Sequence, residues 1–144
     1  MNIPERTFSW SRLELFRFSA ATGNAHRIHY DVDYARSEGL ESVVVHTTLH
    51  ALMLWQTLTA AVDERSVRGF EWRNHAPLYD DQPVVVQAVA ERDGNGWRVA
   101  LSERRIEDAR VVCSGHALVE ERSGVVAEAG DNDVVSGHLA RSPR

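Results

Sequence analysis

An uncharged stretch over residues 47–62 constrains the fold more than any other part of the chain. It reads TTLHALMLWQTLTAAV and contains no glycine or proline. Apolar residues fall on nearly every side of a helix drawn through it, which predicts a helix buried all round rather than along one stripe. A chain of 144 residues has room for one domain. Something within that domain must wrap the helix, and a curved sheet is the natural candidate.

The segments around this helix supply the sheet and two shorter helices. Four downstream segments are typical of strands: residues 67–74, 83–92, 97–106 and 110–121. Asp93-Gly94-Asn95-Gly96, between the second and third of them, is typical of a hairpin turn. Upstream, residues 11–22 and 31–39 predict helices, the first with Leu13, Phe16 and Ala20 at helical spacing. Asp31 is the expected N-cap of the second helix and Gly39 its end. We expect an α+β domain over residues 1–122 and a flexible tail over residues 123–144.

Composition excludes several classes of protein. All 16 basic residues are arginine. The absence of lysine excludes enzymes that form a Schiff base through lysine and nucleotide-binding proteins that use a Walker-A lysine. Cys113 is the only cysteine, which excludes an intramolecular disulfide and a cysteine metal cluster. A net charge of −5 argues against binding nucleic acid, and no apolar run is long enough to cross a membrane. We expect a cytoplasmic enzyme or binding module.

The polar segment over residues 22–31 is the best candidate for chemistry. It contains His26 and His29, three residues apart, but no assured third ligand, so we expect no metal. The segment precedes the apolar helix, whose free N–H groups attract developing negative charge. A histidine beside such an end can transfer a proton next to a carbonyl. The alternative is that both histidines are ordinary surface-loop residues.

Residues 18–35, FSAATGNAHRIHYDVDYA, resemble the hydratase motif of the MaoC-like family of (R)-specific enoyl-CoA hydratases and 3-hydroxyacyl dehydratases. The resemblance implies the hot-dog fold, a long helix in a curled antiparallel sheet, and a paired assembly. Val44-Val45-His46 is similar to the family's Ala-His-Gly entry into the helix. The Phe70-x-Trp72-Arg73 segment, with Pro77-Leu78, resembles the subgroup of mesaconyl-CoA and itaconyl-CoA hydratases.

The resemblance also implies catalytic roles. The family motif places an Asp and a His five residues apart, and Asn24 and His29 match those positions. An amide cannot take up a proton, so Asn24 is expected only to orient water or substrate, and His29 to act alone as base and acid. Thr47 stands where the family usually has glycine, and its N–H is expected to hold the thioester oxygen. Asp31 is better explained as a helix cap than as a substitute carboxylate.

Four further residues are expected to contact substrate. Arg27 and Arg73 could hold phosphates or an acidic acyl group, with a surface ion pair as the favoured alternative for Arg27. His46 is expected to shape the pocket, or alternatively to be satisfied by backbone at a strand end. His26 is the remaining candidate on the loop. No cofactor is expected, because the pantetheine arm belongs to the substrate.

These observations predict a hydratase or dehydratase that adds or removes water across the α,β bond of an acyl-CoA or acyl-carrier-protein thioester. One alternative is a hot-dog thioesterase, although no carboxylate lies between Val43 and Val62 and the nearest upstream is Glu41. Another is a non-catalytic acyl-binding subunit, and a third places the same dehydration in polyketide biosynthesis. A sheet covering one side of a helix leaves an edge open, so we expect a homodimer, or less favourably a heterodimer with a degenerate partner.

Overall fold

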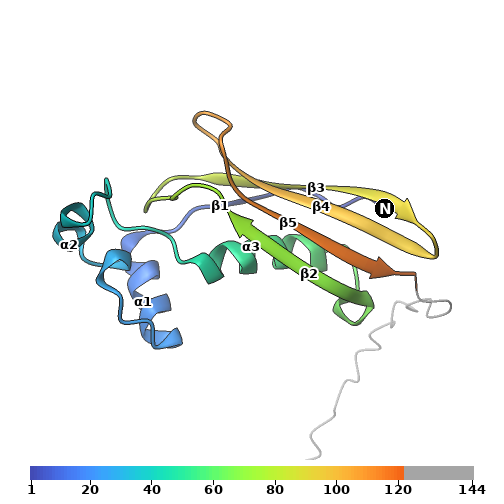
Figure 1. The fold of residues 1–144 in the computed structure, drawn as a ribbon, viewed down its shortest axis with the longest axis horizontal. Coiled ribbons are helices and arrows are strands. Elements are labelled where there is room, and N and C mark those ends of the chain that lie inside the picture. The colour runs from blue at the N-terminus through green and yellow to red at the C-terminus, as the bar shows by residue number, and fades with distance from the viewer. Residues whose placement is uncertain (122–144) are drawn as a thin grey trace, which may run out of the picture.

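A computed structural model describes residues 1–121, and the predicted tail over residues 123–144 lies outside them. The chain forms one antiparallel sheet and one long helix across it, with shorter helices at one end (Figure 1). The strands are β1 (Arg6–Phe8), β2 (Val67–Asn74), β3 (Val84–Asp93), β4 (Gly96–Arg105) and β5 (Val111–Glu120). The helices are α1 (Arg12–Thr22), α2 (Val32–Ser37) and α3 (Thr47–Thr59), with single 3-10 turns η1 (Arg27–His29) and η2 (Glu64–Ser66).

The sheet has the order β1-β3-β4-β5-β2, which makes β2 one of its two edges. The predicted hairpin is confirmed: β3 and β4 pair in register from Val84 with Arg105 to Asp93 with Gly96. The four strands predicted downstream of the helix are all present within a residue or so of their expected bounds. Strand β1 was not predicted, because three residues are too few for alternation to be visible.

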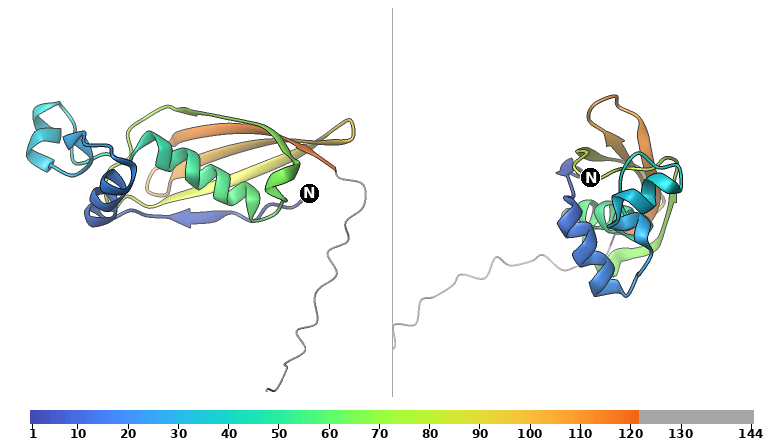
Figure 2. Two further views of the ribbon diagram at one scale, coloured as in Figure 1. Left: turned by 90° about the horizontal axis from the view of Figure 1, so that it is seen from below. Right: turned by 90° about the vertical axis from the view of Figure 1, so that its left-hand side faces the viewer.

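Helix α3 lies along one face of the sheet (Figure 2). Its buried residues are Leu49, His50, Met53, Leu54, Thr57 and Leu58. Gly115 of β5 permits close packing, since an added Cβ would lie 3.0 Å from Leu54 Cδ1 and 2.8 Å from the carbonyl oxygen of Glu71. The prediction of a helix buried on all sides is wrong for the single chain: Leu52 remains 37% exposed and Trp55 is only half-buried. The sheet covers α3 from one side, and residues 1–121 leave Leu52 and Gln56 exposed on the helix.

The short helices gather beyond the N-terminal end of α3 (Figure 2). Ser11 caps α1 through a reciprocal pair of contacts with Glu14. The apolar residues at helical spacing in α1, Leu13, Phe16 and Ala20, are exposed, and α1 instead buries Leu15 and Ser19. Both predicted limits of α2 are confirmed. Asp31 accepts a hydrogen bond from the Tyr34 N–H, and Gly39 follows the helix with a φ of +83°.

Candidate active site

His29 ends η1 with its side chain turned inward, and the residue is only 7% exposed. Its Nδ1 lies 2.8 Å from the carbonyl oxygen of Val44. Because a carbonyl can only accept, Nδ1 carries the proton and Nε2 holds the lone pair of the neutral ring. Within residues 1–121 Nε2 has no hydrogen-bond partner, yet it is not among the fully buried polar atoms that lack one. His29 therefore presents an unprotonated ring nitrogen that is not fully enclosed.

A second imidazole, that of His46, stacks on His29. The two ring centroids are 3.7 Å apart and the ring planes differ by 15°. His46 is 1% exposed, and its Nε2 lies 2.7 Å from the hydroxyl oxygen of Ser19 in α1. The edge of Phe18, also in α1, packs against it at 4.8 Å between centroids. The sequence alternative of a histidine satisfied by backbone is wrong, because the partner is a serine side chain from another helix.

Both rings are held neutral at neutral pH. Desolvation lowers the pKa of His29 most, and the nearby His26 lowers it further, while the hydrogen bond to Val44 acts in the opposite direction. Desolvation also lowers the pKa of His46, to about 4, with a smaller contribution from His29. A neutral His29 is the form that can accept a proton from substrate.

The N-terminus of α3 lies next to this stack, because His46 is the N-cap residue of that helix. The His46 side chain makes no capping hydrogen bond. The first N–H groups of a helix have no partner within it and form the positive end of its dipole. Thr47, the first residue of α3, is exposed. The site thus combines a neutral base with N–H donors suited to an oxyanion.

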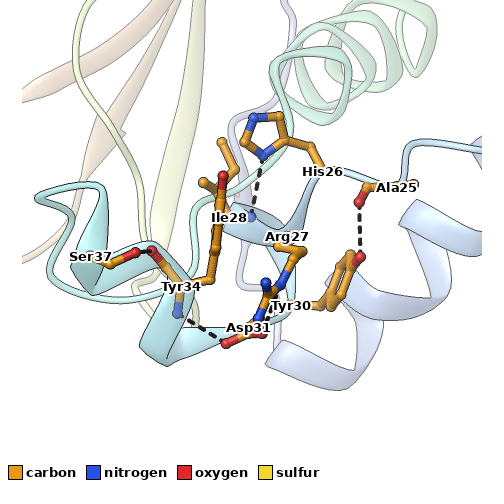
Figure 3. A network of polar contacts seen from close by, with 8 residues as sticks. All are labelled: Ala25, His26, Arg27, Ile28, Tyr30, Asp31, Tyr34 and Ser37. Atoms are coloured by element: carbon orange, nitrogen blue, oxygen red, sulfur yellow. Dashed lines mark hydrogen bonds and ion pairs between the residues drawn. The ribbon is translucent and has the colours of Figure 1, made fainter.

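The loop between α1 and η1 is ordered by its own polar groups (Figure 3). The Asn24 side-chain oxygen accepts a hydrogen bond from the His26 N–H at 3.1 Å, and His26 Nδ1 accepts from the Ile28 N–H at 3.4 Å. The Tyr30 hydroxyl donates to the carbonyl oxygen of Ala25 at 2.8 Å. The amide oxygen of Asn24 is therefore used within the loop, which leaves its NH₂ group as the part free to orient a ligand.

Arg27 forms the ion pair that sequence analysis favoured for it. Its Nη2 lies 2.6 Å from Asp31 Oδ2, and its guanidinium lies 4.6 Å from the centre of the Tyr34 ring. Asp31 itself caps α2 (Figure 3). Both charged groups are thus occupied in shaping the loop.

A hollow of about 230 Å³ lies between α1 and this loop. Its lining residues are Phe16, Ser19, Ala20, Gly23, Asn24, Ala25 and Tyr30. It brings Asn24 together with Ser19, the residue that holds His46. Neither His29 nor Thr47 lines this hollow. His29 and the start of α3 are linked through His46, whereas Asn24 is linked to them only through the His26 N–H of the loop and the Ser19 side of the hollow.

Arg73 lies near the end of β2, at the same end of the sheet as the α3 N-terminus (Figure 1). The segment after β2 is hydrogen-bonded to the one before α3, through the Val45 N–H and the carbonyl oxygen of Leu78 at 2.8 Å. Arg73 is exposed, and within the described part of the chain its guanidinium has no acidic partner. Arg73 pairs with Ser114 and lies on the face of the sheet away from α3, whereas its neighbour Trp72 pairs with Gly115 on the face that packs against α3. The structure therefore does not bring Arg73 together with His29.

Two residues that contribute to the site, Ser19 and Val44, were not predicted. Ser19 lies in a helix whose apolar spacing drew attention to other positions, and Val44 acts through its carbonyl oxygen, which any residue possesses. His50 is a hydrogen-bonded core residue as expected, with Glu103 as its partner at 2.9 Å. In residues 1–121 no three metal-ligating side chains come together.

Comparison with known proteins agrees with this geometry. Residues 2–80, more than half of the chain, match the family model for hydroxyacyl-thioester dehydratase type 2. The chain belongs to this family. It is also 50% identical over 88 residues to mesaconyl-C(4)-CoA hydratase from Chloroflexus aurantiacus. That match covers 60% of this chain but 30% of the relative, so the chain spans far less than two thirds of that protein.

Solved structures resemble the fold at low sequence identity. The ChsH1–ChsH2 complex from Mycobacterium tuberculosis aligns with a TM-score of 0.74 at 15% identity, over 83% of this chain and 94% of that one. The (R)-hydratase from A. caviae involved in PHA biosynthesis aligns with a TM-score of 0.72 at 15% identity, over 83% of this chain and 96% of that one. A MaoC-like dehydratase from Phytophthora capsici aligns with a TM-score of 0.71 at 15% identity, over 83% of this chain and 40% of that one. The hot-dog fold and the MaoC-like resemblance predicted from the sequence are confirmed. None of the helices in the described region is long and apolar enough to span a membrane.

Proposed function

We propose that this type 2 dehydratase chain hydrates α,β-unsaturated acyl thioesters and dehydrates 3-hydroxyacyl thioesters. The observation that carries the proposal is the state of His29. Its Nδ1–H is fixed by the Val44 carbonyl, so the ring offers an unprotonated Nε2 beside the uncapped start of α3. A base and an oxyanion site side by side are what proton removal next to a thioester carbonyl requires.

The proposed dehydration uses a single proton carrier. His29 Nε2 takes the proton from the α-carbon, and the electrons left behind form an enolate whose oxygen accepts a hydrogen bond from the Thr47 N–H. The imidazolium then gives its proton to the 3-hydroxyl group, which leaves as water while the α,β double bond forms. Hydration is the reverse. The NH₂ group of Asn24 orients the hydroxyl or the water.

The proposed substrate is a thioester of CoA or of a carrier protein. Arg73, which has no acidic partner within residues 1–121, is suited to a phosphate or to a second carboxylate on the acyl group, provided that this part of the substrate extends past the end of β2 to the outer face of the sheet. The printed name of the Chloroflexus relative makes mesaconyl-C(4)-CoA the first dicarboxylic substrate to test. His26 is the further candidate contact on the loop. The expected cytoplasmic location remains a prediction from sequence.

We also propose that two copies of the chain pair through β2. This strand is an edge of the sheet, and an open edge invites pairing. Beside it lie exposed apolar side chains, Trp72 at 43% and Leu52 at 37%, and Phe70 stands between Trp55 and Trp72 at 5.3 and 6.0 Å between ring centroids. A second copy would cover the open side of α3. A heterodimer would use the same edge.

The direct test is a panel of crotonyl, longer-chain and mesaconyl thioesters, assayed for loss of the conjugated absorbance. We expect turnover of at least one, and a fall of about 10²–10⁴-fold in kcat for His29→Ala, the range typical of a lost general base. Asn24→Asp should keep or raise activity. Release of free thiol would instead indicate a thioesterase, and binding without turnover an acyl-binding subunit. Abolished turnover in a folded Asn24→Asp variant would contradict the role given to the amide.

A further inference from the structure

The stacked pair of imidazoles has an inner member that substrate cannot touch. His46 is 1% exposed and lies behind His29, with Ser19 and Phe18 of α1 on its other contacts. A side chain so enclosed is unsuited to the substrate-binding role that the sequence suggested for it. His46 instead connects α1 with His29, the proposed base, and the reason for this connection needs an explanation.

The polar contacts of His46 keep its ring uncharged. Within residues 1–121, Nε2 has the Ser19 hydroxyl as its partner at 2.7 Å, while Nδ1 is buried without a partner. An imidazolium needs two acceptors, since both of its nitrogens are donors. Protonation would leave a buried cationic N–H unpaired, and that costs more than leaving a neutral group unpaired. A neutral, flat ring can stack closely on a second neutral ring, as it does here.

His29 itself has two close contacts in the described region that orient its ring, besides the more distant edge contact with His26 at 6.2 Å between ring centroids. One is the hydrogen bond to Val44, which sets the position of Nδ1, and about which the ring could still turn. The other is the face of His46 at 3.7 Å, which fixes the ring plane. The direction in which Nε2 points therefore depends on where His46 lies, and His46 is anchored by Ser19.

We infer that Ser19 and His46 are positioning residues, which hold the His29 ring in the plane that aims Nε2 at the substrate. The inference rests on the proposed function of His29 as the base. Neither residue transfers a proton: Ser19 anchors His46 through Nε2, and His46 supplies the surface against which His29 lies. Misplacing a catalytic group by about 1 Å can cost on the order of 100-fold in rate.

Two substitutions of His46 separate the ring from the hydrogen bond. His46→Phe keeps an aromatic face and loses the bond to Ser19, whereas His46→Gln keeps an amide that can reach Ser19 and loses the ring. We expect His46→Gln to lower kcat on the order of 100-fold with KM changed less than about threefold, and His46→Phe to retain activity within about tenfold of the wild type. Ser19→Ala should resemble His46→Phe. Ser66→Ala is the matched control: Ser66 is 6% exposed and its hydroxyl donates to the carbonyl oxygen of Asp63 at 2.6 Å, so its kinetics should match the wild type.

A second readout needs no turnover, namely the titration of the His29 ring followed by NMR in substrate-free protein. Losing the His46 ring admits water, so the pKa of His29 should rise toward its ordinary value in His46→Gln but less in His46→Phe. In a plot of kcat/KM against pH, the midpoint of the acid limb should shift to higher pH in His46→Gln, and by less in His46→Phe. The titratable and charged groups near this stack are His26, Arg27, Asp31 and Tyr34, and all of these stay unchanged in the three variants.

The outcomes distinguish this inference from the proposed function. If wild-type protein turns over no thioester, the proposed function fails, and the His29 titration alone decides the positioning role. An unchanged kcat and an unchanged His29 titration in His46→Gln would overturn the inference. A loss confined to KM would overturn it too, by making His46 a substrate contact. Should His46→Gln fail to fold, His46→Asn, which also removes the ring, decides by the same two measurements.

Discussion

The two stacked imidazoles couple the chemistry of the site to its stability. Each has a lowered pKa, that of His46 reaching about 4 from an ordinary 6.5. The folded protein therefore binds fewer protons than the unfolded chain between these values, and folding is opposed as the pH falls. The same neutrality that makes His29 a base makes the region sensitive to acid.

We predict that the free energy of unfolding falls as the pH drops from 6.5 to 4, with about 3 kcal/mol due to His46, since each pKa unit corresponds to about 1.4 kcal/mol. Well above pH 6.5 both states are neutral at this residue and its effect is constant. Urea unfolding at a series of pH values measures this directly. In His46→Phe the slope over that window should be shallower by the same amount, and an identical slope in the variant would show that His46 does not titrate on unfolding.

At the scale of single elements, a buried histidine–glutamate pair links α3 to the sheet. His50 Nδ1 of α3 lies 2.9 Å from Glu103 Oε2 of β4, and their side chains are 3% and 0% exposed. No other described side chain hydrogen-bonds to either of them. Removing one partner of such a pair is far costlier than replacing both with apolar residues of similar size.

We expect Glu103→Ala to destabilise the protein by about 3–5 kcal/mol, because His50 is left buried without its partner. The double variant His50→Leu/Glu103→Met should recover most of that loss. Glu91→Ala, at an exposed position on β3, serves as the control and should stay within about 0.5 kcal/mol of the wild type. Chemical unfolding checks all three, and a Glu103→Ala variant as stable as the control would contradict the role of the pair.

Local patterns identified the elements well and their burial less well. The Asp-Gly and Asn-Gly turn, the cap at Asp31 and the four alternating strands are properties of a few adjacent residues, and all were predictable. The open side of α3 was not, because composition shows that a helix is apolar but not how much of it the sheet reaches. The Ser19 contact to His46 depends on how α1 packs, and no local pattern encodes it.

For the whole molecule, the main exposed apolar surface lies at the β2 edge of the sheet. Leu52 of α3 and Trp72 of β2 are exposed, and the half-buried rings of Trp55 and Phe70 contact one another between these two elements. An exposed apolar patch of this kind is unusual for a surface that meets only water. In the proposed dimer these side chains meet their equivalents across a two-fold axis, an arrangement in which each residue's contact is made twice.

We predict a solution mass of twice the 16.2 kDa of one chain, measured by light scattering after size exclusion. Trp72→Asp places a charge in the proposed interface and should yield monomers. Val89→Asp is the matched control, because Val89 is exposed at 63% on β3, away from the β2 edge, and this variant should remain dimeric. A monomeric wild type, or a dimeric Trp72→Asp variant, would contradict pairing through β2.

The central claim is that one imidazole, without a carboxylate, carries the proton in both directions. Hydration of a crotonyl thioester in D₂O, analysed by mass spectrometry, tests it most directly in wild-type protein and in His29→Gln. The wild type should form the 3-hydroxyacyl product with one deuterium at the α-carbon. Folded His29→Gln should form this product at a rate at least about 100-fold lower. Product formed by His29→Gln at a rate within a few fold of the wild type would contradict the account.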